Sequence, residues 1–254
     1  MSDPVEIQQL DGILIIAINR PLQRNAVNRA VSLAIATAVD RLESDPELRV
    51  GIITGHGGYF CAGMDLKAFA DGERPEIEGR GFAGLTEAPP EKPLIAAVEG
   101  FALAGGCELA LTCDLIVAAE TAWFGLPEVQ RGLVAGSGGL VRLPRRIPEA
   151  IALEYALTGE RMDANTAHKW GLVNRVTKEG AALDGAIAMA KAITANAPLS
   201  IAMTKRIVRE APNWAEAEIW TLQRPLVDLV IGSEDALEGA RAFSEKRAPQ
   251  WKGR

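Results

Sequence analysis

The chain has 254 residues, 33 acidic and 27 basic side chains, a formal net charge of −6 and a hydrophobic fraction of 48%. This composition is typical of a soluble globular protein and excludes a disordered or collagen-like chain. The negative balance gives no electrostatic footprint for nucleic acid, so a nucleic-acid partner is not expected. At this length roughly three quarters of the unfolded chain's surface can be buried, enough for one large domain.

The first residues and the cysteines predict a cytoplasmic protein. The start, MSDPVEIQQL, has acidic rather than basic residues before any apolar run, unlike a signal peptide. The longest stretch without Asp, Glu, Lys or Arg, residues 50–64, is Gly-rich and too short to cross a bilayer. Three cysteines without a CxxC pair suit reduced thiols. We therefore expect no membrane segment and no disulfide framework.

The first half of the chain alternates short apolar runs with helical patterns, which predicts an α/β fold. Apolar residues at positions 31, 35, 38 and 42 fall on one face of an amphipathic helix. A second helix is expected to begin just after Ala104-Gly105-Gly106. The predicted strands are 13–18, 50–54, 94–98 and 115–118.

From about residue 149 onward the strand signals stop and helical periodicity takes over. The predicted helices are 163–170, 181–195, 200–209 and 214–231. Asn196-Ala197-Pro198 interrupts two of them, which is consistent with a domain boundary near residue 195 or with an ordinary turn between helices. The predicted domains are a core of residues 1–195 and a C-terminal helical region of residues 196–254.

Common catalytic signatures are missing from the sequence. The Gly-rich segment 100–106 matches neither the dinucleotide-binding nor the P-loop fingerprint. Ser137 lies in Ala-Gly-Ser-Gly-Gly, which lacks the first glycine of a GxSxG elbow, so a serine hydrolase is disfavoured. His56 and His168 have no metal-ligand spacing and are interpreted as loop and surface residues. No metal site is predicted.

The most informative residue is Glu108, a carboxylate inside a short helix whose neighbours are almost all apolar. Burying a charge there is expensive, and a desolvated glutamate with a raised pKa suits proton transfer near neutral pH. The alternative is a Glu108 side chain that points to solvent. Gly105 and Gly106 place free N–H groups of the helix start within one turn of this carboxylate, which predicts an anion site beside a base.

Two further segments indicate a function only when they are considered together with Glu108. The turn 60–67, Phe-Cys-Ala-Gly-Met-Asp-Leu-Lys, has small residues that would let a ligand approach the backbone, and it ends on the positive charge of Lys67. On its own it reads as a plain turn capped by Asp65. Glu128 follows Pro127 in what looks like the first turn of a helix. Alone, Glu128 would be interpreted as a surface residue.

Together these segments resemble the enoyl-CoA hydratase, or crotonase, family over nearly the whole chain. The matching pieces are Asn19-Arg-Pro, Asn25-Ala, 60–67, 100–114, Phe124-Gly-Leu-Pro-Glu128, 136–139, Leu157-Thr-Gly-Glu160, Gly171-Leu-Val-Asn174, Asn196-Ala-Pro198 and Phe243-Ser-Glu-Lys-Arg. The resemblance implies a spiral of ββα turns with a C-terminal helical trimerisation region. It implies a homotrimer or a dimer of trimers, and an acyl-CoA thioester as substrate without any metal or redox cofactor.

The resemblance also implies the roles of individual residues. The backbone N–H groups of Met64 and Gly105 would hold the thioester oxygen, and Glu108 and Glu128 would be the catalytic pair of a hydratase acting on a 2-trans-enoyl-CoA. Phe243 and Lys246 would reach a neighbouring subunit's coenzyme A site. The other substrate contacts implied are Arg24, Ala26, Ala62, Asp65, Leu66 and Lys67.

Related activities remain open at the level of sequence. Ala135 stands where a proline is common, and Leu140-Val141 replace the more usual Thr-Gln pair, so the acyl group is not predicted. A carnitinyl-CoA-type dehydratase and an enoyl-CoA isomerase look much alike at this level. A non-catalytic acyl-CoA-binding protein and an RNA-binding relative are alternatives of a different class, which the complete glutamate pair and the acidic balance argue against.

Overall fold

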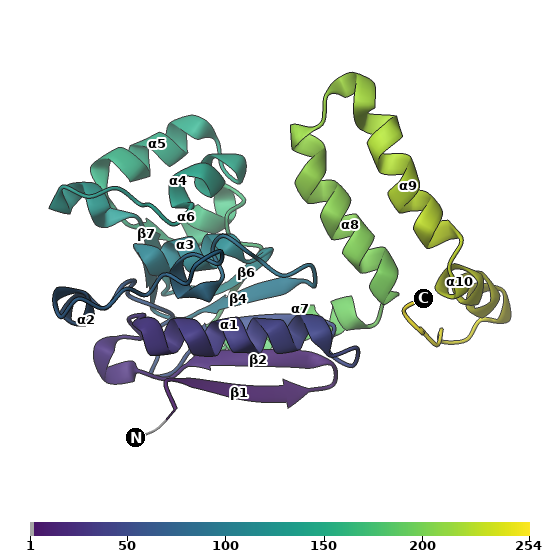
Figure 1. Cartoon of the computed structure of the whole chain (residues 1–254), viewed down its shortest axis with the longest axis horizontal. Coiled ribbons are helices and arrows are strands. Elements are labelled where there is room, and N and C mark those ends of the chain that lie inside the picture. The colour runs from purple at the N-terminus through teal and green to yellow at the C-terminus, as the bar shows by residue number, and fades with distance from the viewer. Residues whose placement is uncertain (1–2) are drawn as a thin grey trace.

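The computed structural model describes residues 3–254 and contains two sheets wrapped by helices (Figure 1). The larger sheet has six strands in the order β1-β2-β3-β4-β6-β9. Only β1 runs antiparallel to its neighbour, and all other pairs are parallel. Its strands are β1 (Val5–Leu10), β2 (Ile13–Ile18), β3 (Val50–Gly55), β4 (Leu94–Val98), β6 (Leu115–Ala119) and β9 (Arg175–Thr177).

The smaller sheet repeats the order of the larger one, which makes the chain a spiral. It contains β5 (Phe101–Leu103), β7 (Trp123–Gly125) and β8 (Met162–Asp163). Strand β5 follows β4 and β7 follows β6, so each turn of the chain adds one strand to each sheet. A bridge from Cys61 to Ala102 adds the turn that follows β3. The predicted α/β spiral of ββα turns is confirmed.

Helices cover both faces of the larger sheet. Helix α1 (Arg29–Ser44) packs on one face, where Val31, Ile35 and Leu42 are fully buried. Helix α7 (Ala182–Thr194) covers the other face through Ala186, Met189 and Ala190. Because both faces are covered, β2 is an uninterrupted buried apolar run rather than an alternating one.

The remaining elements form the rim of the spiral and the C-terminal region. Three short 3-10 helices that matter below are η1 (Pro21–Gln23), η2 (Phe82–Gly84) and η3 (Pro127–Arg131). The other helices are α2 (Leu66–Ala70), α3 (Gly105–Thr112), α4 (Gly139–Arg142), α5 (Glu149–Thr158), α6 (Ala164–Lys169), α8 (Pro198–Glu210), α9 (Ile219–Ile231) and α10 (Glu234–Glu245).

The predicted strands and most of the predicted helices are confirmed within a few residues. The expectation that strands stop after residue 149 is wrong, because β8 and β9 lie beyond it. Both are only two or three residues long and partly exposed, so they leave no apolar run to recognise. The helix predicted over 214–231 begins only at Ile219, because Trp214 and Ala215 are extended.

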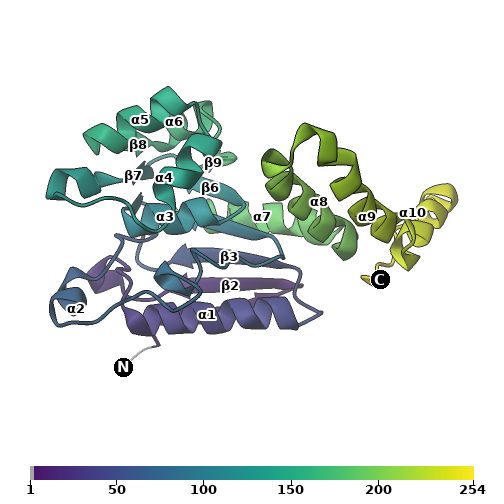
Figure 2. The same cartoon turned by 45° about the horizontal axis from the view of Figure 1, so that its top comes forward.

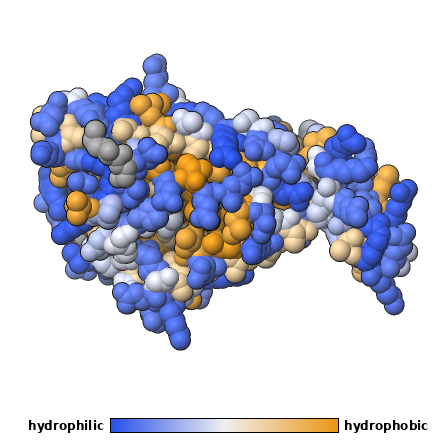
Figure 3. All heavy atoms as spheres, turned by 90° about the horizontal axis from the view of Figure 1, so that it is seen from below, coloured by the Kyte–Doolittle hydropathy of each residue, from blue (hydrophilic) through white to orange (hydrophobic). Residues whose placement is uncertain are grey.

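Helices α8, α9 and α10 form an arm that projects from the spiral, and Figures 1 and 2 agree on this placement. Neither α8 nor α9 contains a buried residue. The arm is attached to the body through polar contacts: Lys205 and Arg209 of α8 both pair with Asp114, at 2.7 Å. In Figure 3 the arm extends from the body as a separate lobe. No single helix within residues 3–254 is long and apolar enough to cross a membrane.

Candidate active site

Glu108 lies in the first turns of α3 with its carboxylate turned inward, and only 3% of the residue is exposed. Its Oε1 accepts hydrogen bonds from the backbone N–H of Ser137, at 2.7 Å, and of Gly139, at 2.9 Å. Burial raises the pKa of Glu108, although these two N–H groups favour the charged form and reduce that rise. The solvent-facing alternative for Glu108 is excluded.

Gly139 is required for this geometry. A Cβ atom at that position would lie 2.9 Å from Cγ of Glu108 and 3.2 Å from its Oε1. Real Cβ atoms do not approach other heavy atoms this closely without displacing them. The Gly-rich turn that precedes α4 thus serves as a backbone cradle for one carboxylate.

Glu128 lies in the first turn of η3, directly after Pro127, so the predicted helical turn is present as a 3-10 turn. The residue is half-buried, and its Oε2 is a buried atom without a hydrogen-bond partner in residues 3–254. Burial and the nearby charge of Glu108 both raise the pKa of Glu128. A buried carboxylate oxygen without a donor is rare in folded proteins and favours a protonated or ligand-facing carboxyl.

Two backbone N–H groups, those of Met64 and Gly105, point away from the hydrogen-bonded sides of their own peptides. Val27 donates to the carbonyl of Gly63 and accepts from the N–H of Asp65. Because C=O and N–H of a trans peptide point in opposite directions, the N–H of Met64 points away from Val27. The carbonyl of Ala104 likewise accepts from Glu108 inside α3, so the N–H of Gly105 points out of the helix start.

The two peptides are in close contact. A Cβ atom on Gly63 would lie 3.2 Å from the nitrogen of Gly105. Ala104 has a strained backbone, with φ 48° and ψ −125°, and its N–H is held by the carbonyl of Gly125 at 2.9 Å. Neither the Met64 nor the Gly105 N–H has a protein acceptor in the described chain. Strain of this kind persists where surrounding contacts impose it, often at functional sites.

The residues predicted to contact coenzyme A fall into two groups. Arg24, Ala26, Ala62 and Asp65 come together, because the Arg24 carbonyl accepts from the Ala62 N–H at 3.1 Å. Arg20 joins them: its guanidinium donates to the Ala26 carbonyl and pairs with Asp65 at 2.8 Å. Asp65 also caps α2, as the plain-turn interpretation required. Although burial opposes it, hydrogen bonds from Ala68 and Arg20 lower the pKa of Asp65.

The other predicted contacts are exposed or remote. Leu66 and Lys67, in the first turn of α2, point to solvent, and Leu66 is 60% exposed. Phe243 and Lys246 belong to the end of α10, and Phe243 is 88% exposed. Figures 1 and 2 place α10 at the far end of the arm, away from α3. Within one chain, these two residues are therefore not brought to the carboxylates.

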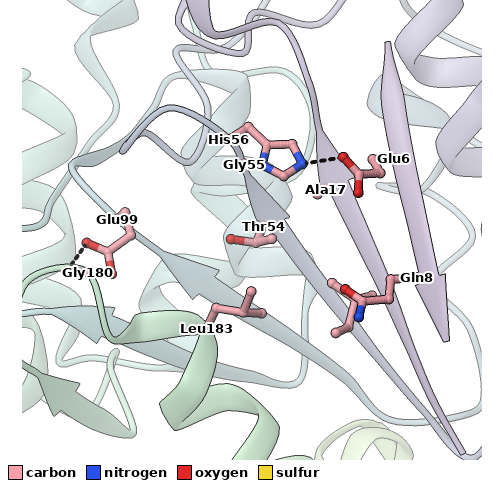
Figure 4. A pocket seen from close by; sticks show the side chains of 10 residues that line it. Glu6, Gln8, Ala17, Thr54, Gly55, His56, Glu99, Gly180 and Leu183 are labelled. Atoms are coloured by element: carbon pink, nitrogen blue, oxygen red, sulfur yellow. Dashed lines mark hydrogen bonds and ion pairs between the residues drawn. The ribbon is translucent and has the colours of Figure 1, made fainter. Parts of the chain in front are cut away.

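A hollow of about 130 Å³ lies elsewhere, beside the start of α7 and against β1, β2 and β3 of the larger sheet (Figure 4). Glu6 pairs with His56 across it at 3.0 Å, and Glu99 accepts from Gly180 at 3.1 Å. None of the predicted site residues lines it. His168 is bound to the carbonyl of Val173. Within residues 3–254 no cluster of His, Cys, Asp or Glu could hold a metal ion.

Sequence reasoning missed the backbone donors of Glu108 and the role of Arg20. Ser137 and Gly139 act through N–H groups, which carry no side-chain signature. The Gly-rich turn was nevertheless a usable signal, since closely spaced glycines often mark a backbone that contacts another group. Arg20 lies in a segment quoted for the resemblance, but only the fold shows that it meets Asp65.

The fold and the site define a class: a spiral α/β protein with one buried and one half-buried carboxyl, and with two backbone N–H groups that have no acceptor in the described chain. Residues 8–254 match the enoyl-CoA hydratase/isomerase family. The chain belongs to that family. An enoyl-CoA hydratase from Mycobacterium tuberculosis H37Rv is 58% identical over the whole of both chains, with a TM-score of 0.98. One from Mycobacterium marinum is 59% identical, also with a TM-score of 0.98. The carnitinyl-CoA dehydratase of Proteus mirabilis is 45% identical over the full length of both proteins.

Proposed function

We propose that this protein is an enoyl-CoA hydratase that reversibly adds water to a 2-trans-enoyl-CoA thioester. The observation that carries the proposal is the pair Glu108 and Glu128, whose pKa values are both raised by burial, together with two backbone N–H groups that have no acceptor within residues 3–254. Relatives that are 58% and 59% identical carry the name enoyl-CoA hydratase. Two carboxyls allow one to act as base and the other as acid.

In the proposed mechanism the thioester oxygen accepts from the N–H groups of Met64 and Gly105. Negative charge develops on this oxygen when water adds at C3 and C2 becomes a carbanion equivalent, and the two donors are aimed at it in advance. Removing one such donor typically weakens transition-state binding by about 3 to 4 kcal/mol. The position of Gly105 at the start of α3 adds the positive end of the helix dipole.

The two carboxyls share the proton transfers. Glu108, held by Ser137 and Gly139, would orient the water and take its proton as the new C–O bond forms at C3. Glu128 would deliver a proton to C2, which completes the addition. Dehydration runs the same steps backward, with Glu128 removing the C2 proton and Glu108 protonating the departing hydroxyl. Each hydration thus moves one proton from water to Glu108 and one from Glu128 to C2. Exchange with solvent then restores the starting protonation state of both carboxyls.

The coenzyme A part would be held by the cluster around Arg24, Ala26, Ala62 and Asp65, with Leu66 and Lys67 at its solvent side. Arg20 stiffens this cluster by binding the Ala26 carbonyl and Asp65. The ammonium group of Lys67 is exposed and would contact phosphate. Binding energy from this remote part would align the acyl group at the carboxylates.

The active assembly is proposed to be a homotrimer or a dimer of trimers. Two sets of exposed apolar side chains bear on this assembly, one on the arm and one on the body around η3, α4 and α5. The arm set is Trp220, Leu229, Ile231, Leu237 and Phe243. The body set is Leu133, Val134, Val141, Leu153 and Leu157. Contact between arm and body of two copies would cover both sets and bring Phe243 and Lys246 to a neighbour's coenzyme A.

This proposed assembly gives the two parts of the chain different roles. Residues 1–195 would form the catalytic core, and residues 196–254 would form the region that joins subunits. The cytoplasm is the proposed location, since Cys61, Cys107 and Cys113 are all free and buried, as suits a reducing compartment.

A second candidate, carnitinyl-CoA dehydratase, is favoured by full-length relatives of that name. The two functions are separated by offering the purified protein crotonyl-CoA and carnitinyl-CoA at equal concentration. Loss of the conjugated enoyl absorbance reports hydration of the first, and its appearance reports dehydration of the second. We expect at least about tenfold higher kcat/KM for crotonyl-CoA, corresponding to about 1.4 kcal/mol of transition-state preference. The reverse order would establish the second candidate, and turnover of neither would reject both.

A further inference from the structure

Arg142, the last residue of α4, folds back onto the turn that holds Glu108. Its Nη1 donates to the carbonyl of Ser137 at 3.1 Å, and its Nη2 donates to the carbonyl of Thr86. The N–H of the same Ser137 donates to Glu108. One guanidinium therefore fixes the residue whose backbone holds the base.

The turn is shaped to admit this side chain. Gly138 has a φ of 98°, and a Cβ atom there would collide with the guanidinium of Arg142. Gly138 thus combines a left-handed backbone with the empty space that the arginine occupies. This close fit distinguishes Arg142 from Arg145, which is exposed and makes no hydrogen bond or ion pair in residues 3–254.

Arg142 also connects the base to the oxyanion donors. Thr86 closes the turn of η2, donating its N–H to the carbonyl of Phe82 at 3.2 Å. The ring of Phe82 lies directly against Gly105, where a Cβ atom would be 2.6 Å from Cζ. The two hydrogen bonds of Arg142 therefore run to the turn behind Glu108 and to the segment that packs on Gly105.

The charge of Arg142 is not used in an ion pair. The side chain is half-buried, yet no carboxylate of the described residues lies within 4.0 Å of it. Glu108 is the acidic group whose charge acts on it most strongly. A half-buried cation held by neutral carbonyls costs desolvation without a compensating pair, which favours a role beyond stability.

We infer that Arg142 is a positioning residue that fixes Glu108 relative to the Gly105 N–H and keeps that carboxylate charged for its role as base. This inference rests on the proposed function, because it assigns Arg142 to the hydration step. Arg142 acts by holding the turn at Ser137 and through the electrostatic field of its guanidinium charge, without touching substrate.

The titratable groups around Glu108 come from three elements. The charge of Glu108 raises the pKa of Glu128 of η3, whereas the charge of Arg142 of α4 partly offsets the rise that burial gives the pKa of Glu108. Cys107 of α3 stays a neutral thiol, because burial raises its pKa to about 12. Arg142 is therefore the cationic group that favours the charged form of Glu108 in this set, and its removal should raise the pKa of the base.

The test compares Arg142→Met, Arg142→Lys and the matched control Arg145→Met on crotonyl-CoA across pH. Wild-type hydration is measured first: an inactive wild type rejects the proposed function and with it the role of Arg142, whereas an active wild type lets the variants test Arg142 alone. For Arg142→Met we expect kcat to fall about tenfold to a hundredfold, as for a small misplacement of a reacting group. Its KM should stay near wild type, and the acid limb of the kcat/KM profile should move to higher pH.

Arg142→Lys keeps the charge but replaces the two-nitrogen fork of the guanidinium by a single nitrogen, which cannot reproduce the geometry of both hydrogen bonds. Its acid limb should therefore stay in place while kcat falls by at least about threefold. Arg145→Met removes an equal charge nearby and should match wild type in both readouts. Circular dichroism establishes folding of each variant. If Arg142→Met does not fold, the lysine variant decides alone. Any one of three results would overturn the inference. They are a folded Arg142→Met with unchanged kcat and an unchanged acid limb, equal shifts in Arg142→Met and Arg145→Met, and a wild-type kcat in Arg142→Lys.

Discussion

The interior around α3 and the arm formed by α8, α9 and α10 differ in how far the chain itself surrounds and binds their side chains. Glu108 is 3% exposed and finds both hydrogen-bond donors of its Oε1 within its own chain. On the arm, Trp220 is 69% exposed and Phe243 88% exposed, so residues 3–254 leave most of both side chains uncovered. Glu108 is therefore held within its own chain, whereas the large apolar side chains of the arm are left uncovered.

This difference separates the chemistry from the assembly. Both carboxyls proposed to move protons belong to the spiral, and Glu108 is fixed there by backbone contacts, so a single chain already contains both groups. The groups proposed to complete the coenzyme A site are held by an arm that a second copy would have to meet. Substitutions in the body should therefore change kcat, and substitutions in the arm should change association and substrate binding.

The largest effect is expected from the two carboxyls. Glu108→Gln and Glu128→Gln should each lower kcat for hydration by at least about a hundredfold, because each removes one proton transfer. Isosteric glutamines keep the packing, so folding and coenzyme A ester binding should be retained. A steady-state assay together with a binding titration checks both statements. Near-normal turnover by either variant would favour a one-base reaction such as isomerisation.

An effect of similar size is expected at the Gly105 N–H. Gly105→Pro removes the donor and should abolish most activity, by about 10²-fold to 10³-fold in kcat. Proline also adds a Cβ atom that would press on Phe82. The control is Gly105→Ala, which adds the same atom but keeps the N–H, and it should lose much less. Met64→Ala also keeps its N–H and should lose little.

Equal losses in the proline and alanine variants at position 105 would mean that packing against Phe82, rather than the lost donor, explains the effect. A loss in Met64→Ala as large as that in Gly105→Pro would assign the role to the Met64 side chain. Either result would remove the backbone oxyanion proposal at that position.

The Gly-rich turn that holds Glu108 allows a third comparison, between substitutions at two of its glycines. Gly139→Ala places a Cβ atom 2.9 Å from Cγ of Glu108 and should lower kcat about tenfold or more, because the base must shift. Gly136→Ala meets only the Val134 carbonyl at 3.9 Å, so its activity should stay within about twofold. Measured kcat values for the two folded variants suffice. Similar activities would show that Glu108 tolerates displacement.

The smallest effect on the chemistry is expected from the arm. Deleting residues 233–254 should abolish the trimer and weaken coenzyme A ester binding about tenfold, equivalent to about 1.4 kcal/mol, while the carboxyls stay in place. Phe243→Ala keeps α10 and isolates one contact. Light scattering and a coenzyme A ester titration measure the two properties. A monomeric full-length protein, or a truncated trimer with unchanged affinity, would contradict the proposed assembly.

Much of the fold was predictable, because buried parallel strands leave apolar runs that can be recognised directly. Strand β2 and helix α1 have this signature, and both were predicted within two residues. Strands β8 and β9 lack it, since two or three partly exposed residues do not make a pattern. Their place is determined by pairing with β7 and β6, which is tertiary information.

The site was predictable in its side chains and less so in its backbone. A carboxylate among apolar neighbours identified Glu108, and the fold decided between burial and solvent. The donors that hold it, Ser137 and Gly139, act through peptide N–H groups that every residue except proline has. Arg142 is separated from Thr86 by more than fifty positions, so only the folded chain shows that it joins them.

The central claim is that hydration depends on the two carboxyls of one intact chain. Its most direct test is the time course of crotonyl-CoA hydration by the full-length protein, beside the Glu108→Gln/Glu128→Gln double variant at the same enzyme concentration and the same bound fraction of substrate. We predict loss of the enoyl absorbance with the wild type and none above buffer with the double variant. A silent wild type, or a double variant that keeps pace with it, would contradict the account.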